Sequence, residues 1–172
     1  MQRMRTRMLL KGANAGTIFF FFFIVVAMSL CACDSDKIYE SNVNIPADGW
    51  YRAEHARFEV EITDTINPCN VYINVRNNSK YKYMELWLFV GVHSPSGAVE
   101  SDTTKIILAD HRGKWLGHGL GNKFDTRIVF RENVRFPAAG KYVIEYEQAT
   151  RDEPLIGIDD IGLRIEKVKI NK

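Results

Sequence analysis

The feature that most constrains the fold of this chain is a hydrophobic pattern that repeats every two residues. In residues 57–62 (RFEVEI) every second side chain is apolar and those between are charged, and residues 141–147 (KYVIEYE) repeat the pattern. This period is that of a β-strand with one buried and one solvated face. After residue 33, no segment longer than about two turns shows the period of a helix. The pattern therefore predicts an all-β domain.

The predicted strands follow one another at regular spacing, with turn residues between them. They are residues 57–62, 70–76, 86–92, 99–109, 127–130, 141–147 and 161–170. About seven to eight short strands in such an order predict an antiparallel β-sandwich, with an open barrel as the alternative.

Two of these strands depart from simple alternation. Residues 86–92 (LWLFVGV) are apolar on both faces, which indicates a central strand that is covered on both sides or one whose outer face meets a partner. In the last strand the apolar positions change parity near Glu166 and Lys167, so a β-bulge is predicted there.

The N-terminus has the three parts of a bacterial lipoprotein signal. A basic stretch with Arg3, Arg5, Arg7 and Lys11 precedes the apolar residues 17–30 (TIFFFFFIVVAMSL). Leu30-Cys31-Ala32-Cys33 then supplies a branched residue, a small residue and a cysteine in the order that lipidation and cleavage require. Cys33 is the predicted lipid attachment site, carrying diacylglycerol and an N-acyl chain. A retained transmembrane helix is the alternative, because residues 12–33 approach the length that a bilayer requires.

This reading divides the chain into residues 1–32, a signal peptide that is removed, residues 33–49, a lipidated N-terminus and polar tether, and residues 50–172, the β-sandwich domain. The whole chain has 23 Lys and Arg against 21 Asp and Glu. Four of the basic residues lie in the signal, so the mature part carries a net charge of −2. A nucleic-acid partner therefore has no electrostatic support. Cys69 has no intramolecular partner and is predicted to be a small buried hydrophobe.

The glycine-rich residues 110–121 (DHRGKWLGHGLG) form the most distinctive loop. Asp110, His111 and His118 suggest a metal site, but their spacing matches no strong zinc pattern, and no cofactor is expected. The loop is predicted to be structural first. Arg112, Lys114, Trp115 and His118 are in addition its candidate protein-contact residues, because Arg and Trp are enriched at binding hot spots.

No clustered nucleophile, acid and base is evident in the sequence, so no catalytic residues are assigned and an enzyme is not expected. A glycan-binding surface is an alternative function. It would need Trp50, Tyr51, Trp87 and Trp115 exposed as a stacking platform, whereas aromatic residues in a sandwich are more often core.

Several blocks resemble a known family. They include Leu86-Trp87-Leu88-Phe89-Val90, Gly113-Lys114-Trp115-Leu116-Gly117-His118-Gly119 and Gly162-Leu163-Arg164-Ile165-Glu166-Lys167. Together they are similar, over residues 50–167, to the gliding-motility lipoprotein GldH family of Bacteroidota. The resemblance implies a non-catalytic envelope lipoprotein needed for a gliding machinery that shares parts with the type IX secretion system. It also implies protein partners from that apparatus. Asp34 and Asp36 after Cys33 resemble a surface-export signal, so the outer membrane is expected, with the leaflet left open.

Overall fold

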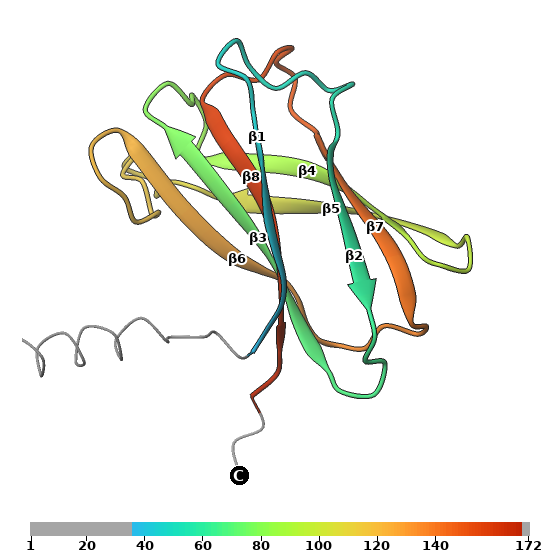
Figure 1. Cartoon of the computed structure of the whole chain (residues 1–172). Coiled ribbons are helices and arrows are strands. Elements are labelled where there is room, and N and C mark those ends of the chain that lie inside the picture. Colours follow the sequence, from blue (N-terminus) through green and yellow to red (C-terminus); the bar gives the residue numbers. More distant parts are fainter. Residues whose placement is uncertain (1–35, 170–172) are drawn as a thin grey trace, which may run out of the picture. The chain divides into compact units, whose positions relative to one another are not determined.

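The computed structural model describes residues 36–169 and shows two four-stranded antiparallel sheets that form a sandwich (Figure 1). The strands are β1 (Lys37–Asn44), β2 (Ala56–Ile62), β3 (Cys69–Asn78), β4 (Glu85–His93), β5 (Val99–Ile107), β6 (Lys123–Val134), β7 (Gly140–Gln148) and β8 (Ile158–Lys167). The first sheet has the order β1-β8-β3-β6 and the second has the order β2-β7-β4-β5. The predicted sandwich is confirmed, and the open barrel is wrong.

The period-two pattern becomes the inner faces of the two sheets. Along β2 buried and exposed residues alternate without a break. In β8 the inward side chains Ile161, Leu163 and Ile165 are completely buried. Trp50 is also completely buried, and its main chain pairs with Leu155. Apolar burial on both inner faces is the main stabilising term, at roughly 25 cal/mol per Å² of apolar surface.

The predicted tether is wrong over most of its length. Residues 37–44 form β1, which pairs with β8 from Lys37↔Glu166 to Asn44↔Asp160. Tyr39 and Val43 pack against the core, because they share the parity of an inward-facing strand. The sandwich therefore begins at residue 37 and not at residue 50. The predicted signal and Cys33 lie outside the described residues.

The predicted bulge is correctly placed along the sandwich but lies on another strand. β8 pairs with β3 in unbroken register from Arg76↔Asp160 to Cys69↔Lys167, and the register of this pair shifts only at the other end of β8, between Arg76 and Asn77. The shift occurs where β1 passes from Lys37↔Glu166 to Tyr39↔Ile165, so Ile38 is the extra residue. A bulge in β8 itself near Glu166 is therefore wrong. β6 also extends far beyond the predicted residues 127–130.

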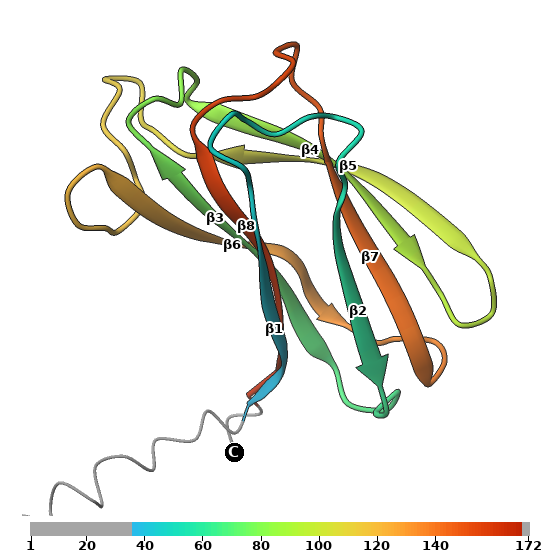
Figure 2. The same cartoon turned by 45° about the horizontal axis from the view of Figure 1, so that its top comes forward.

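The strand order places the loops at two opposite ends of the sandwich (Figures 1 and 2). The proximal end holds the start of β1, the end of β8, and the loops of residues 63–68 and 135–139. The distal end holds the loops of residues 45–55, 79–84, 108–122 and 149–157. In residues 36–169 no helix is long and apolar enough to cross a membrane.

Candidate functional site

Residues 110–121, the predicted contact loop, lie at the distal end between β5 and β6. Arg112, Lys114 and His118 are exposed, whereas Trp115 is half-buried. The Asp110 Oδ1 atom accepts the backbone N–H groups of Arg112 at 2.8 Å and Lys114 at 2.9 Å. Asp110 therefore shapes a turn that presents both cationic side chains to solvent.

The Trp115 ring is held by two other aromatic rings. Its centroid lies 6.4 Å from that of Tyr81 and 5.6 Å from that of Phe124. The loop also approaches β6 closely, because a Cβ atom at Gly119 would lie 1.8 Å from the Lys123 carbonyl oxygen. Trp115 thus supports the loop, and the exposed members of the predicted contact set are Arg112, Lys114 and His118.

Among residues 36–169 neither a metal-binding cluster nor an exposed cysteine is found. In residues 36–169 no group of three or more His, Cys, Asp or Glu side chains is arranged to hold a metal ion. Cys69 is 3% exposed, and its Sγ lies 3.5 Å from the Val134 carbonyl oxygen. Burial raises the pKa of this thiol, which disfavours the reactive thiolate form. The prediction that Cys69 is a buried hydrophobe is confirmed.

The four aromatic side chains considered as a sugar platform do not share one exposed surface. Trp50 is a core residue whose Nε1 donates to the Glu54 carbonyl oxygen at 2.7 Å. Trp115 is packed as described above. Tyr51 and Trp87 are exposed. A platform made of all four is therefore wrong.

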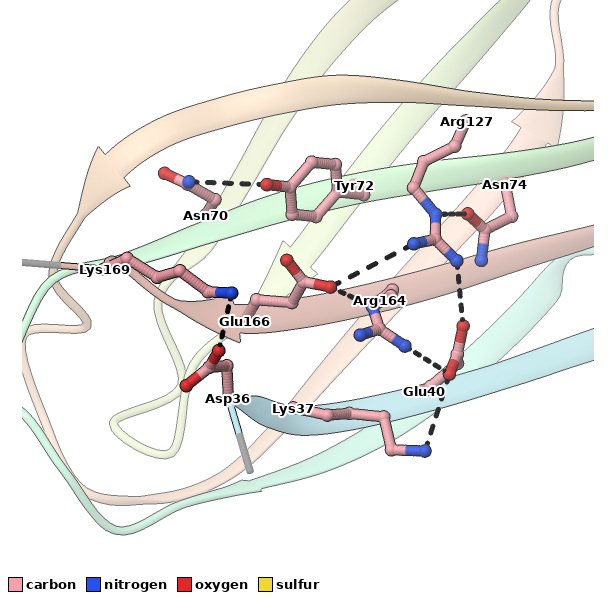
Figure 3. Close-up of polar contacts among 10 residues, drawn as sticks. All are labelled: Asp36, Lys37, Glu40, Asn70, Tyr72, Asn74, Arg127, Arg164, Glu166 and Lys169. Carbon is pink, nitrogen blue, oxygen red and sulfur yellow. Dashed lines mark hydrogen bonds and ion pairs between the residues drawn. The ribbon is translucent and has the colours of Figure 1, made fainter. Parts of the chain in front are cut away.

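The outward face of the first sheet carries a network of charged and polar side chains (Figure 3). Arg164 of β8 donates to Glu40 of β1 at 2.6 Å and forms a second, very close ion pair with Glu166. Arg127 of β6 donates to Glu40 at 3.2 Å and to the Asn74 Oδ1 at 2.9 Å. Although Arg164 points outward, its side chain is only 8% exposed, because these neighbours cover it.

The network continues toward both ends of the sheet. At the proximal end the Lys169 Nζ lies 3.1 Å from an Asp36 carboxylate oxygen (Figure 3). Toward the distal end Arg76 pairs with Asp125 at 2.6 Å and with Asp160 at 3.2 Å. Cations and carboxylates are thus matched along the face, which makes it a structural surface and a poor docking site for apolar side chains.

The outward face of the second sheet has the opposite character. Trp87 and Phe89 of β4 are 42% and 47% exposed, although the inward Leu86 and Leu88 are completely buried. The neighbouring Ile107 of β5 is 50% exposed. Since β4 lies between β7 and β5, Trp87 and Phe89 stand in the middle of the sheet, whereas Ile107 lies on the edge strand β5. Exposed aromatic side chains in the middle of a sheet make this face a candidate interaction surface.

The exposure of this aromatic surface (Trp87, Phe89 and Ile107) distinguishes between the two interpretations of residues 86–92, namely cover on both faces and contact of the outer face with a partner. Within residues 36–169 the outer face of β4 is not covered, so cover on both faces by this part of the chain is wrong, and contact with a partner is the interpretation to test. Beside Phe89, the missing side chain of Gly91 leaves a hollow of about 560 Å³. Two histidines and two glutamates line it, and the His93 Nε2 lies 3.4 Å from a Glu145 carboxylate oxygen. These histidines and glutamates are His55, His93, Glu145 and Glu147.

Sequence reasoning misses the Arg164 network because the polar pattern of residues 34–45 predicts a tether that includes Glu40. The signal that could have found β1 is the shared parity of Tyr39, Val43 and Ile45, which marks one apolar face. The pairing of Glu40 with Arg164 had no local signal, since the two residues are far apart in the chain.

The comparisons with known proteins agree with this architecture. Residues 37–165 match the GldH lipoprotein family. A "Gliding motility lipoprotein GldH homolog" of Christiangramia forsetii is 34% identical over 143 residues, covering 79% of this chain and 87% of the relative. The "Gliding motility lipoprotein GldH" of Flavobacterium johnsoniae is 28% identical over 148 residues, covering 82% and 91%.

A solved structure of an arabinose-bound α-L-arabinofuranosidase matches 75% of this chain and 19% of its own, with 11% identity and a TM-score of 0.36. This likeness is too low to support an argument. The family match spans all eight strands from the start of β1 into β8, and includes the glycine-rich loop as well as Glu40, Arg127 and Arg164. The chain therefore belongs to the GldH lipoprotein family.

Proposed function

We propose that this protein is a non-catalytic, lipid-anchored accessory or assembly subunit of a gliding-motility machinery that is linked to type IX secretion. The family assignment supports a role in gliding motility and in the envelope. The single observation that carries the partner-binding role is the aromatic surface on β4, because Trp87 and Phe89 stand exposed in mid-sheet.

The proposed anchor is the lipid on Cys33. Leu30 and Ala32 suit the peptidase, and a diacylglycerol with an N-acyl chain supplies several buried chains at about 0.8 kcal/mol per methylene. Asp34 and Asp36 favour the outer membrane as the site of the anchor. Confinement to one membrane raises the effective concentration of partners there, so a weak interface suffices.

The proposed partner surface joins the aromatic surface to the exposed side of the contact loop. The Met84 carbonyl oxygen accepts the N–H groups of Leu108 and Ala109 at 2.7 and 3.1 Å, where β5 leads into the loop. Met84 is itself 48% exposed. Arg112 and Lys114 would then supply the polar rim of an interface whose centre is aromatic.

Photo-cross-linking in the intact membrane tests this proposal. A photoreactive phenylalanine replaces Phe89 in one strain and Val129 in another. Val129 is a matched control, because it is 43% exposed and lies on the outward face of the other sheet. We expect position 89 to capture motility or secretion components and position 129 to capture few. Equal capture at both positions, or none at position 89, would contradict the proposal.

Glycan binding is the second candidate, and the hollow beside Phe89 is the observation that favours it. An aromatic ring next to carboxylates suits a sugar, which stacks on the ring and donates hydroxyl hydrogens to Glu145 and Glu147. A glycan array distinguishes the two functions. Saturable binding that is lost in Trp87→Ala or Phe89→Ala would favour glycan binding as the function. An array that shows no binding would favour a protein partner.

A further inference from the structure

The folded domain begins within three residues of the proposed lipid attachment site. The Asp36 carbonyl oxygen accepts the Lys167 N–H at 2.8 Å, and β1 begins at Lys37. Three residues extend over at most about 11 Å. The tether expected over residues 33–49 would have allowed a separation of roughly 50 Å. If Cys33 carries the lipid, as proposed above, the proximal end of the sandwich is therefore held against the bilayer.

At this same end the loop of residues 63–68 presents Ile66, whose side chain is 79% exposed. The loop leads directly into Cys69, which pairs with Lys167 next to the start of β1. Figure 2 shows the β2–β3 loop and the start of β1 at one end of the sandwich. An apolar side chain thus projects from the end that faces the membrane.

The backbone that carries Ile66 is fixed by hydrogen bonds. The Asp64 Oδ1 accepts the N–H groups of Ile66 at 2.9 Å and Asn67 at 3.0 Å, and the Asp64 Oδ2 accepts the Asn67 side-chain amide at 2.7 Å. The Arg135 Nε donates to the Ile66 carbonyl oxygen at 2.9 Å. Ile66 is therefore held outward by the fold, without contacts that would bury it.

The charges around Ile66 suit the phosphates of a lipid headgroup layer. Arg135 and Lys167 are exposed next to the loop. Two of the nearby carboxylates have partners within the protein, because Asp64 accepts three hydrogen bonds and Asp36 pairs with Lys169. Cationic side chains that flank an apolar tip are the arrangement by which peripheral proteins bind an anionic lipid surface.

From these observations we infer that the proximal end is a membrane-contact surface, in which Ile66 enters the headgroup layer while Arg135 and Lys167 bind lipid phosphates. The inference rests on the proposed lipid at Cys33. The contact orients the sandwich, so that the loop with Arg112 and Lys114 points away from the bilayer.

The full processed lipoprotein in vesicles of phosphatidylethanolamine and phosphatidylglycerol allows a direct test. An environment-sensitive dye is attached to Ile66→Cys or to Leu120→Cys. Leu120 is the matched control, because it is a 93% exposed apolar residue at the distal end. Cys69 does not compete for the dye, since it is 3% exposed, and an acylated Cys33 has no free thiol.

We expect lipids with a headgroup-level spin label to quench the dye at position 66 and to leave the dye at position 120 unquenched. Adding Lys167→Glu should weaken the quenching at position 66. Protein that floats with the vesicles but shows equal quenching at both positions would overturn the membrane contact and leave the lipid anchor intact. Protein that does not float would overturn both.

Discussion

Arg164 of β8 and Glu40 of β1 are joined by a 2.6 Å hydrogen bond between Nη1 and Oε2, although 124 residues separate them in the chain. The two residues are directly opposite each other in the strand pair. Glu166 lies beside them on the same face and binds the same guanidinium group. The bond ties the first strand of the sandwich to the last, and it places a carboxylate against a cation that solvent hardly reaches.

Replacing Arg164 with alanine should lower the free energy of unfolding by about 2–4 kcal/mol, because Glu40 and Glu166 lose the cation that both contact. Urea denaturation measures the loss. Arg127→Ala is the control, since Arg127 binds Glu40 from a side chain that is 46% exposed. This variant should lose no more than about 1 kcal/mol. Equal losses in the two variants would show that the burial of Arg164 does not increase its contribution to the free energy of unfolding.

The glycine-rich loop should tolerate an added methyl group at one glycine and not at another. In Gly119→Ala the new Cβ meets the Lys123 carbonyl oxygen at 1.8 Å, so the loop must leave β6. At Gly113 nothing lies within 4 Å, and only its positive φ of 78° opposes alanine. We expect Gly113→Ala to cost about 1 kcal/mol and Gly119→Ala clearly more. Thermal unfolding of both proteins checks the order, which would be reversed if the loop were loosely packed.

Substitutions at two neighbouring residues of β4 should affect different properties, namely stability at Leu88 and partner capture at Phe89. Leu88→Ala should lower the free energy of unfolding by about 2–5 kcal/mol, because Leu88 is completely buried. Phe89→Ser should change it by less than about 1 kcal/mol, because its ring is 47% exposed, yet partner capture should be lost. Denaturant unfolding and affinity purification from membranes measure the two effects. A Phe89→Ser protein that unfolds as easily as Leu88→Ala would place Phe89 in the core.

The loop that carries Ile66 should open only in strong acid. Three hydrogen bonds from Asn67 and Ile66 lower the pKa of Asp64 from 3.8 to about 2. Because the folded pKa is depressed, the stabilisation is present above about pH 4 and is lost as the pH falls through about 2. The amide chemical shifts of Ile66 and Asn67 should titrate with that midpoint. In Asp64→Ala the acid transition at these two amides should be absent.

Most of the fold could be predicted from local pattern. The alternation in residues 57–62 and 141–147 reappears as buried and exposed faces of β2 and β7, because side-chain direction in a strand depends only on parity. β1 was missed for a physical reason. An edge strand buries only part of one face, so Tyr39 and Val43 stand among polar residues and the apolar pattern is diluted.

The candidate sites could be predicted only in part. The exposed Arg112, Lys114 and His118 lie where a loop was expected, and the apolar outer face of residues 86–92 was visible in the sequence. The anchoring of Trp115 between Tyr81 and Phe124 was not visible, since three separate segments supply the rings.

By itself the sequence determined the strand pattern and the family and led us to expect a lipoprotein signal, because each depends on residues that are neighbours in the chain. Only the tertiary structure decided that β1 replaces most of the tether, that Arg164 is neutralised by Glu40, and that Trp87 and Phe89 remain uncovered. These features depend on which strands become neighbours. That choice is made by the packing of the whole sandwich and leaves little trace in any short segment.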